Sequence, residues 1–147
     1  MTTKSKVLND NILEINNLKK YYNLTSGILK KVTGQVRAVD DVSFNIPRGK
    51  TIGLVGESGC GKTTISKCIL RAVDPTDGDI FLNNENGSHN LASLTEGELR
   101  PLRKEMQMIF QDPFSSLNPR MNLFDIVSEP LLLNGIRNRT ERQDRVE

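Results

Sequence analysis

The 147-residue chain has 36% apolar residues, 26% charged residues and a formal net charge of +2. This composition is typical of a globular domain and excludes both a disordered chain and a strongly basic one, so no nucleic-acid partner is expected. No stretch reaches the roughly 18 consecutive apolar residues of a membrane-spanning helix, and a membrane role is therefore expected to be peripheral.

In chain order, the sequence predicts strands, polar turns and helices. Residues 1–10 are expected to be flexible and lack the apolar core of a secretory signal, which favours a cytosolic protein. Period-two patterns or short apolar runs predict strands at 11–19, 36–46, 51–55, 79–82 and 106–110. Polar, glycine-containing segments predict loops at 23–34 and 83–90. Helical patterns cover 65–73, 94–104, 122–133 and 140–147.

A glycine-rich segment after the third predicted strand matches the phosphate-loop pattern Gly-x-x-x-x-Gly-Lys-Ser/Thr. Gly56, Gly59 and Gly61 can adopt positive φ without a Cβ in the way, so successive backbone N–H groups can turn toward a phosphate. Lys62 supplies a cation for the β- and γ-phosphates, and the Thr63 hydroxyl can bind Mg²⁺. The following helix directs its positive end at the same anion. The predicted ATP-binding residues of this loop are Gly56, Glu57, Ser58, Gly59, Cys60, Gly61, Lys62, Thr63 and Thr64.

The succession of three segments, 53–64, 74–80 and 109–120, resembles the ATP-binding cassette family. In the last segment, Ser-Ser-Leu-Asn-Pro follows Gln111-Asp112-Pro113, which is similar to the peptide-importer and related nickel-importer branch. The insertion at 27–34 and Gln-Asp-Pro in place of Gln-Glu-Pro resemble the second of the two ATPase subunits in such importers. The resemblance implies an α/β fold, in which a P-loop core of mainly parallel strands lies beside an antiparallel N-terminal β-subdomain.

The resemblance also implies roles for residues outside the phosphate loop. Tyr22 would stack on adenine, with Tyr21 as the alternative, or it would only pack at a sheet edge with its hydroxyl in water. Gln111 would position Mg²⁺ and the attacking water, unless it is a structural loop amide. Residues Phe114–Leu133 would contact the transmembrane permease subunits or form an ordinary helical surface.

Three features of the family are not found in this sequence. They are a Leu-Ser-Gly-Gly-Gln type signature, the apolar strand that ends in Asp-Glu, and the later switch His. Residues 11–147 are therefore expected to be the N-terminal part of a nucleotide-binding domain, truncated before the signature. The chain alone is expected to bind ATP and Mg²⁺ without turnover, because the base and the completed γ-phosphate cage are needed for hydrolysis. It is also expected to leave apolar surface uncovered.

The function implied by the resemblance is to energise peptide import at the cytoplasmic face of the membrane. The expected partners are permease subunits, a second ATP-binding cassette ATPase subunit and, indirectly, a peptide-binding protein. Three alternatives stay open at this point. The chain could belong to a non-transport ATPase of the same family, to a P-loop small-molecule kinase in which Asp112 binds Mg²⁺, or to a catalytically dead nucleotide-binding fragment.

Overall fold

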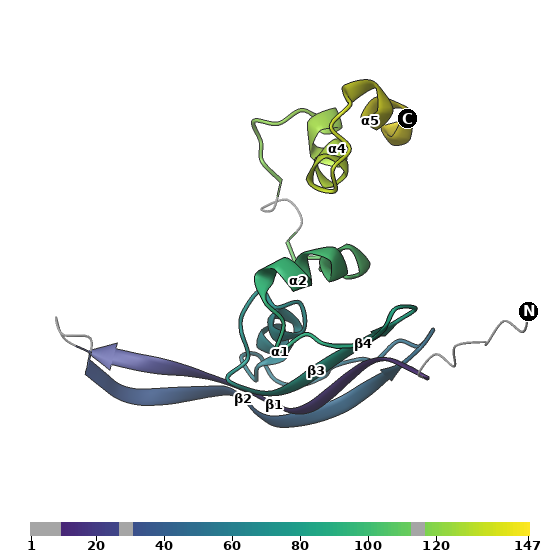
Figure 1. Ribbon diagram of the computed structural model, residues 1–147. Coiled ribbons are helices and arrows are strands. Elements are labelled where there is room, and N and C mark those ends of the chain that lie inside the picture. The colour runs from purple at the N-terminus through teal and green to yellow at the C-terminus, as the bar shows by residue number, and fades with distance from the viewer. Residues whose placement is uncertain (1–9, 27–30, 113–116) are drawn as a thin grey trace, which may run out of the picture. The chain divides into compact units, whose positions relative to one another are not determined.

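The computed structural model describes residues 10–26, 31–112 and 117–147. The chain divides into two compact units, Met1–Arg103 and Lys104–Glu147, and each is described by itself. The first unit contains a sheet with two helices, and the second contains a pair of helices (Figure 1).

The sheet of the first unit is antiparallel and has the strand order β2-β1-β3-β4. Its strands are β1 (Asn11–Ser26), β2 (Lys31–Pro47), β3 (Asp77–Asn84) and β4 (Gly87–Asn90). The pairing of β1 with β3 ends at Lys19, whereas the pairing of β1 with β2 continues to Ser26. The ends of β1 and β2 therefore form a two-stranded ribbon that extends beyond β3 (Figure 1).

Two predicted loops are wrong in this region. All described residues of the predicted loop 23–34 belong to β1 or β2, because cross-strand pairs such as Leu24 with Gly34 satisfy their backbone groups. Residues 27–30 of that loop lie outside the described residues. The predicted loop 83–90 contains the end of β3 and the whole of β4, joined by a tight turn in which Asn84 Oδ1 accepts hydrogen bonds from Asn86 N and Gly87 N.

An irregularity in β1 keeps its apolar side chains on the core side. Ile15 and Leu18 are both fully buried although strict alternation would place them on opposite faces. The register shifts between them, and Asn17 adopts a positive φ of 49°. Gly78 lies against this irregularity, since a Cβ at Gly78 would come within 2.5 Å of Asn17 O. The bulge thus shifts the alternation of the strand by one residue, so that Leu18 faces the core as Ile15 does.

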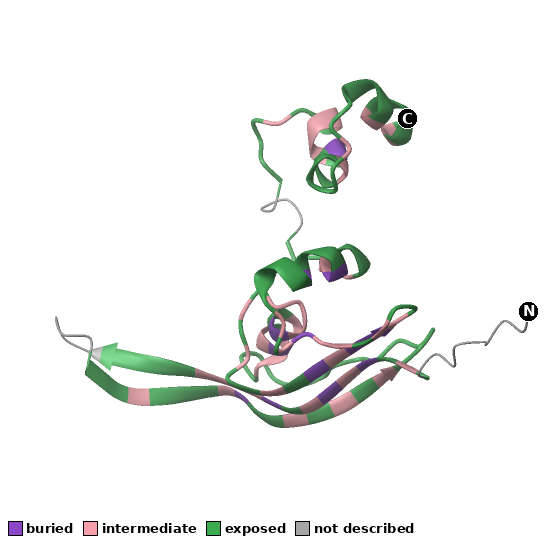
Figure 2. Cartoon of the chain, in the orientation of Figure 1, coloured by how far each residue is buried: buried purple, intermediate pink, exposed green. Residues whose placement is uncertain are grey.

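Helices α1 (Lys62–Ile69) and α2 (Glu96–Leu102) complete the first unit, and α2 continues into the short 3₁₀ helix η1 (Arg103–Glu105). The α1 helix lies against one face of the sheet (Figure 1). In this unit the buried residues lie on the sheet and on the helices α1 and α2 (Figure 2). The apolar core consists of Leu13, Ile15, Leu18, Val39, Ile65, Cys68, Ile80, Leu82, Leu91, Leu99 and Leu102.

The two predicted strands at 51–55 and 106–110 are wrong for the structure described. Neither segment is a strand, and none of the described residues pairs with them in a sheet. A strand needs a neighbour for its backbone N–H and C=O groups, so an apolar run alone does not form one. Val55 and Ile109 are each 92% exposed, which confirms the expectation that apolar surface is uncovered.

The second unit contains α4 (Leu123–Leu133) and α5 (Arg139–Val146), as predicted within one residue at each end. Asn122 begins α4 by accepting a hydrogen bond from Asp125 N, and Asn138 begins α5 by accepting one from Thr140 N. The two helices are joined by a hydrogen bond from Arg142 Nη1 to the buried Ser128 hydroxyl. In the described part of the chain, each helix is too short or too polar to span a bilayer.

Candidate functional site

The glycine-rich loop runs directly into α1 and is exposed over residues 56–60. Cys60 N donates to Glu57 O at 3.3 Å, which closes a turn inside the loop. Gly59 and Gly61 have φ values of +80° and +100°, a region that favours glycine. Gly61 is also the N-cap of α1, and its carbonyl accepts the Ile65 N–H. The loop therefore curls so that its backbone can face an anion at the start of the helix.

Gly61 attaches the loop to the antiparallel sheet. A Cβ added to Gly61 would lie 2.2 Å from Ala38 O and 3.8 Å from a methyl group of Val39. Ala38 and Val39 belong to β2, so this contact joins residues that are more than twenty positions apart in the chain. The sequence motif did not identify these two residues, because no local pattern relates them to position 61.

The Lys62 ammonium folds back over the loop. Lys62 Nζ donates to Gly56 O at 2.7 Å, to Glu57 O at 2.5 Å and to Cys60 Sγ at 3.4 Å. The two carbonyl acceptors carry no formal charge, and none of the ion pairs among the described residues involves Lys62. The loop thus holds a cation that a phosphate group can pair with.

The residues of the loop fit a nucleoside triphosphate with Mg²⁺. A Cβ at Gly56 would approach Cys60 Sγ to 2.7 Å, so a side chain at that position would have to displace the Cys60 side chain. Thr63 is exposed in the first turn of α1, and Thr64 beside it is half-buried. A cation, a hydroxyl and a helix N-terminus therefore meet on one short segment, which matches the needs of a phosphate and its metal.

Tyr22 and Tyr21 have different surroundings on β1. Tyr22 is 40% exposed, and Lys20 Nζ lies 4.9 Å from the centroid of its ring. The Tyr21 hydroxyl donates to the Asp40 carboxylate, and Arg37 lies over the Tyr21 ring at 5.5 Å. This hydrogen bond raises the pKa of Tyr21 and lowers the pKa of Asp40 from their ordinary values.

Tyr22 lies on the part of β1 that pairs with β2 beyond the end of the β1–β3 pairing. It is paired with Val36 of β2, and Lys20 two residues earlier is paired with the buried Val39. Val39 in turn contacts the position of Gly61. Tyr21, by contrast, is held by the hydrogen bond of its hydroxyl and is less exposed, so Tyr22 has the more accessible aromatic surface.

The remaining predicted site residues belong to the second unit. Gln111 and Asp112 are both exposed, and Asp112 has an interaction partner within the structure. The predicted permease-contact segment begins in residues 113–116, so Phe114 lies outside the described residues. Leu123 and Leu133 of α4 are 78% and 70% exposed, so this helix presents apolar side chains at its surface.

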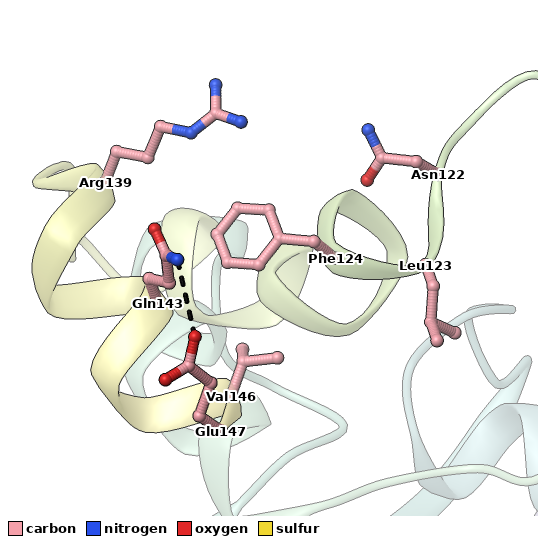
Figure 3. A pocket seen from close by; sticks show the side chains of 7 residues that line it. All are labelled: Asn122, Leu123, Phe124, Arg139, Gln143, Val146 and Glu147. Atoms are coloured by element: carbon pink, nitrogen blue, oxygen red, sulfur yellow. Dashed lines mark hydrogen bonds between the residues drawn. The ribbon is translucent and has the colours of Figure 1, made fainter.

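A pocket of about 590 Å³ lies between α4 and α5 (Figure 3). The Phe124 ring points into it, and Arg139 and Arg142 lie 5.5 and 5.9 Å from the ring centroid. Gln143 donates to Glu147 at the same side of the pocket. The pocket belongs to the second unit and contains none of the residues predicted to bind nucleotide.

Comparisons with known proteins identify relatives of the whole chain. The family model described as "ABC transporter" matches residues 39–147. The oligopeptide transport ATP-binding protein AppF of Bacillus subtilis (strain 168) is 42% identical over 139 residues, which are 94% of this chain and 41% of that protein. The oligopeptide transport ATP-binding protein OppF of the same organism is 44% identical over 142 residues, 95% of this chain and 43% of that protein. The chain thus spans about two fifths of these relatives.

A solved structure has the same fold. It is a dimeric structure of a post-hydrolysis state of the ATP-binding cassette MJ0796 bound to ADP and Pi. It is similar to this chain with a TM-score of 0.71 at 25% identity, over 91% of this chain and 53% of that one. The likeness confirms the predicted α/β fold class, including the antiparallel sheet at its N-terminal side.

Proposed function

The chain belongs to the ABC transporter family, and we propose that it is the ATP-binding part of a subunit that energises the import of peptides. The observation that carries the proposal is the geometry of the phosphate loop. The Lys62 ammonium lies 2.7 Å from Gly56 O, and Gly61 packs against Ala38 of β2, so the loop holds a cation at the start of α1. The relatives named for oligopeptide transport support peptides as the cargo.

Each predicted site residue has one task in this proposal. The backbone N–H groups of residues 56–64 and the Lys62 ammonium bind the phosphates, and the Tyr22 ring stacks on adenine. The Thr63 hydroxyl holds Mg²⁺, which neutralises phosphate charge when it is bound. The family resemblance assigns Gln111 the task of orienting Mg²⁺ and the attacking water through its side-chain amide, which can accept and donate hydrogen bonds.

The partners follow from the same family. A second ATPase subunit would pair with this one, and the residues 114–133 would contact the permease subunits at the cytoplasmic face of the membrane. The exposed apolar side chains of α4, such as Leu123 and Val127, support such a contact. A peptide-binding protein would deliver cargo on the other side of the membrane without touching this chain.

Peptide uptake by cells tests the transport role. In cells whose only copy of the complete protein carries Lys62→Ala, uptake of a labelled tripeptide is expected to fall about tenfold or more, because the phosphates lose a charge-assisted contact. Lys67→Ala is the matched control, since Lys67 lies exposed in the last turn of the same helix. Unchanged tripeptide uptake with Lys62→Ala would contradict the role, and loss of Ni²⁺ uptake alone would replace peptides by nickel as the cargo.

A further inference from the structure

Lys20 connects Tyr22 with the segment that follows α1. Its ammonium donates to Asp74 O at 2.8 Å and at the same time lies 4.9 Å from the Tyr22 ring centroid. The first contact belongs to the loop after the helix, and the second to the aromatic residue proposed to hold adenine. We propose that Lys20 is a positioning residue that holds the Tyr22 ring for the base of the bound nucleotide, an inference that rests on the proposed function.

The backbone around Lys20 is fastened to the same loop. Thr76 N donates to Lys19 O at 2.7 Å, and Tyr21 N donates to Thr76 Oγ1 at 2.9 Å. Lys19 Nζ forms an ion pair with Asp77 at 3.0 Å. The register of β1 against β2 shifts on both sides of Lys20, so regular pairing alone does not fix this stretch. The contacts with the loop after α1 therefore fix the position of the β1 backbone next to Tyr22.

Two contacts connect the phosphate loop with Tyr22, the residue proposed to hold the base. At the beginning of α1, Gly61 lies against Ala38 and Val39 of β2. Beyond the end of α1, Asp74 accepts the bond from Lys20, which is paired with Val39 across the sheet. The helix thus holds the phosphate loop at one end and, through the following loop, the aromatic residue at the other.

The Lys20 ammonium also affects the orientation of the Tyr22 ring. An ammonium within about 6 Å of an aromatic face is attracted by the ring quadrupole. Lys20 thereby restricts the ring to fewer orientations and occupies one side of it, while Tyr22 as a whole is 40% exposed. A purine would meet a pre-oriented aromatic surface, which lowers the entropy lost on binding.

The test compares ATP with inorganic tripolyphosphate, which has the phosphates but no base. In the complete protein that carries this chain, Lys20→Met is expected to weaken ATP binding about three- to tenfold and to leave tripolyphosphate binding unchanged. Lys20→Arg, which keeps a cation, is expected to restore ATP affinity to within about twofold. Lys67→Met is the control for charge, because it removes an exposed ammonium in the last turn of α1.

Three results would overturn the inference while the nucleotide site stands. They are an unchanged ATP affinity of Lys20→Met, an equal loss for ATP and tripolyphosphate, and a loss of the same size when Lys20→Met is added to Tyr22→Leu. In the expected case, Lys20→Met has no further effect once the ring is absent, because it acts through the ring. A wild-type protein that binds neither ATP nor tripolyphosphate would overturn the proposed function and this inference together.

Discussion

Gly61 lies so close to Ala38 that a Cβ at position 61 would come within 2.2 Å of the Ala38 carbonyl oxygen. The clash is with backbone, which cannot move aside as the end of a flexible side chain could. The φ of +100° adds strain for any residue with a side chain. The phosphate loop is therefore held in place by a contact that only glycine allows.

Gly61→Ala is expected to weaken nucleotide binding about tenfold or more and to destabilise the fold by about 2 kcal/mol or more, because the clash and the strain act together. ATP titration and urea unfolding measure the two effects. Gly97→Ala is the matched control, since Gly97 lies in α2 with nothing within 4 Å of its added Cβ. An affinity of Gly61→Ala equal to that of Gly97→Ala would contradict the assigned contact.

The phosphate loop could be predicted from the sequence because its chemistry is local. Gly56, Gly61, Lys62 and Thr63 follow one another within eight positions, and a strand-like run and a helix flank them. Contacts between distant segments could not be predicted in the same way. The support of Gly61 by Ala38 depends on how β2 runs under the loop, and a motif contains no information about that.

The wrong strand and loop predictions also result from contacts between distant segments. The apolar run at 51–55 suggested a buried strand, but a strand exists only where a second strand satisfies its backbone, and the described residues offer none there. The polar composition of 23–34 predicts a loop, but pairs such as Asn23 with Gln35 and Leu24 with Gly34 extend the ribbon. Tertiary pairing thus overrides local propensity in both directions.

Thr63→Ala is expected to remove the Mg²⁺ dependence of ATP binding while the affinity for metal-free ATP stays the same, because the hydroxyl is the proposed metal ligand. Thr63→Ser keeps a hydroxyl and is expected to behave like the wild type. ATP titrations with and without Mg²⁺ measure both variants. An equal response of Thr63→Ala and Thr63→Ser to Mg²⁺ would show that the hydroxyl does not bind the metal.

The two thiols are expected to differ in reactivity. Cys60 is exposed, whereas Cys68 is fully buried and its burial raises the pKa of the thiol. Because the thiolate is the reactive form, a disulfide reagent should modify one thiol quickly in the folded protein and the second only after unfolding. ATP should slow the fast reaction, since Cys60 Sγ lies 3.4 Å from Lys62 Nζ. A fast phase that survives in Cys60→Ser would contradict this assignment.

The ion pair of Asp77 with Lys19 is expected to make the stability depend on pH in the acid range. The hydrogen bond from Lys19 is the largest cause that lowers the pKa of Asp77 in the folded chain. The unfolded Asp titrates near about 3.9, so this contribution is complete above that pH and is lost as pH falls through the lower, folded pKa. Urea unfolding between pH 6 and pH 2 should show a shallower acid decline for Asp77→Asn, and identical declines would rule the contribution out.

Direct titration with Mg-ATP tests the central claim that this chain binds nucleotide through its phosphate loop. Calorimetry of the wild-type chain should show one site, Lys62→Ala should weaken it about tenfold or more, and Lys67→Ala should change it by less than about twofold. Wild-type binding that Lys62→Ala leaves intact, or the absence of any binding, would contradict the account.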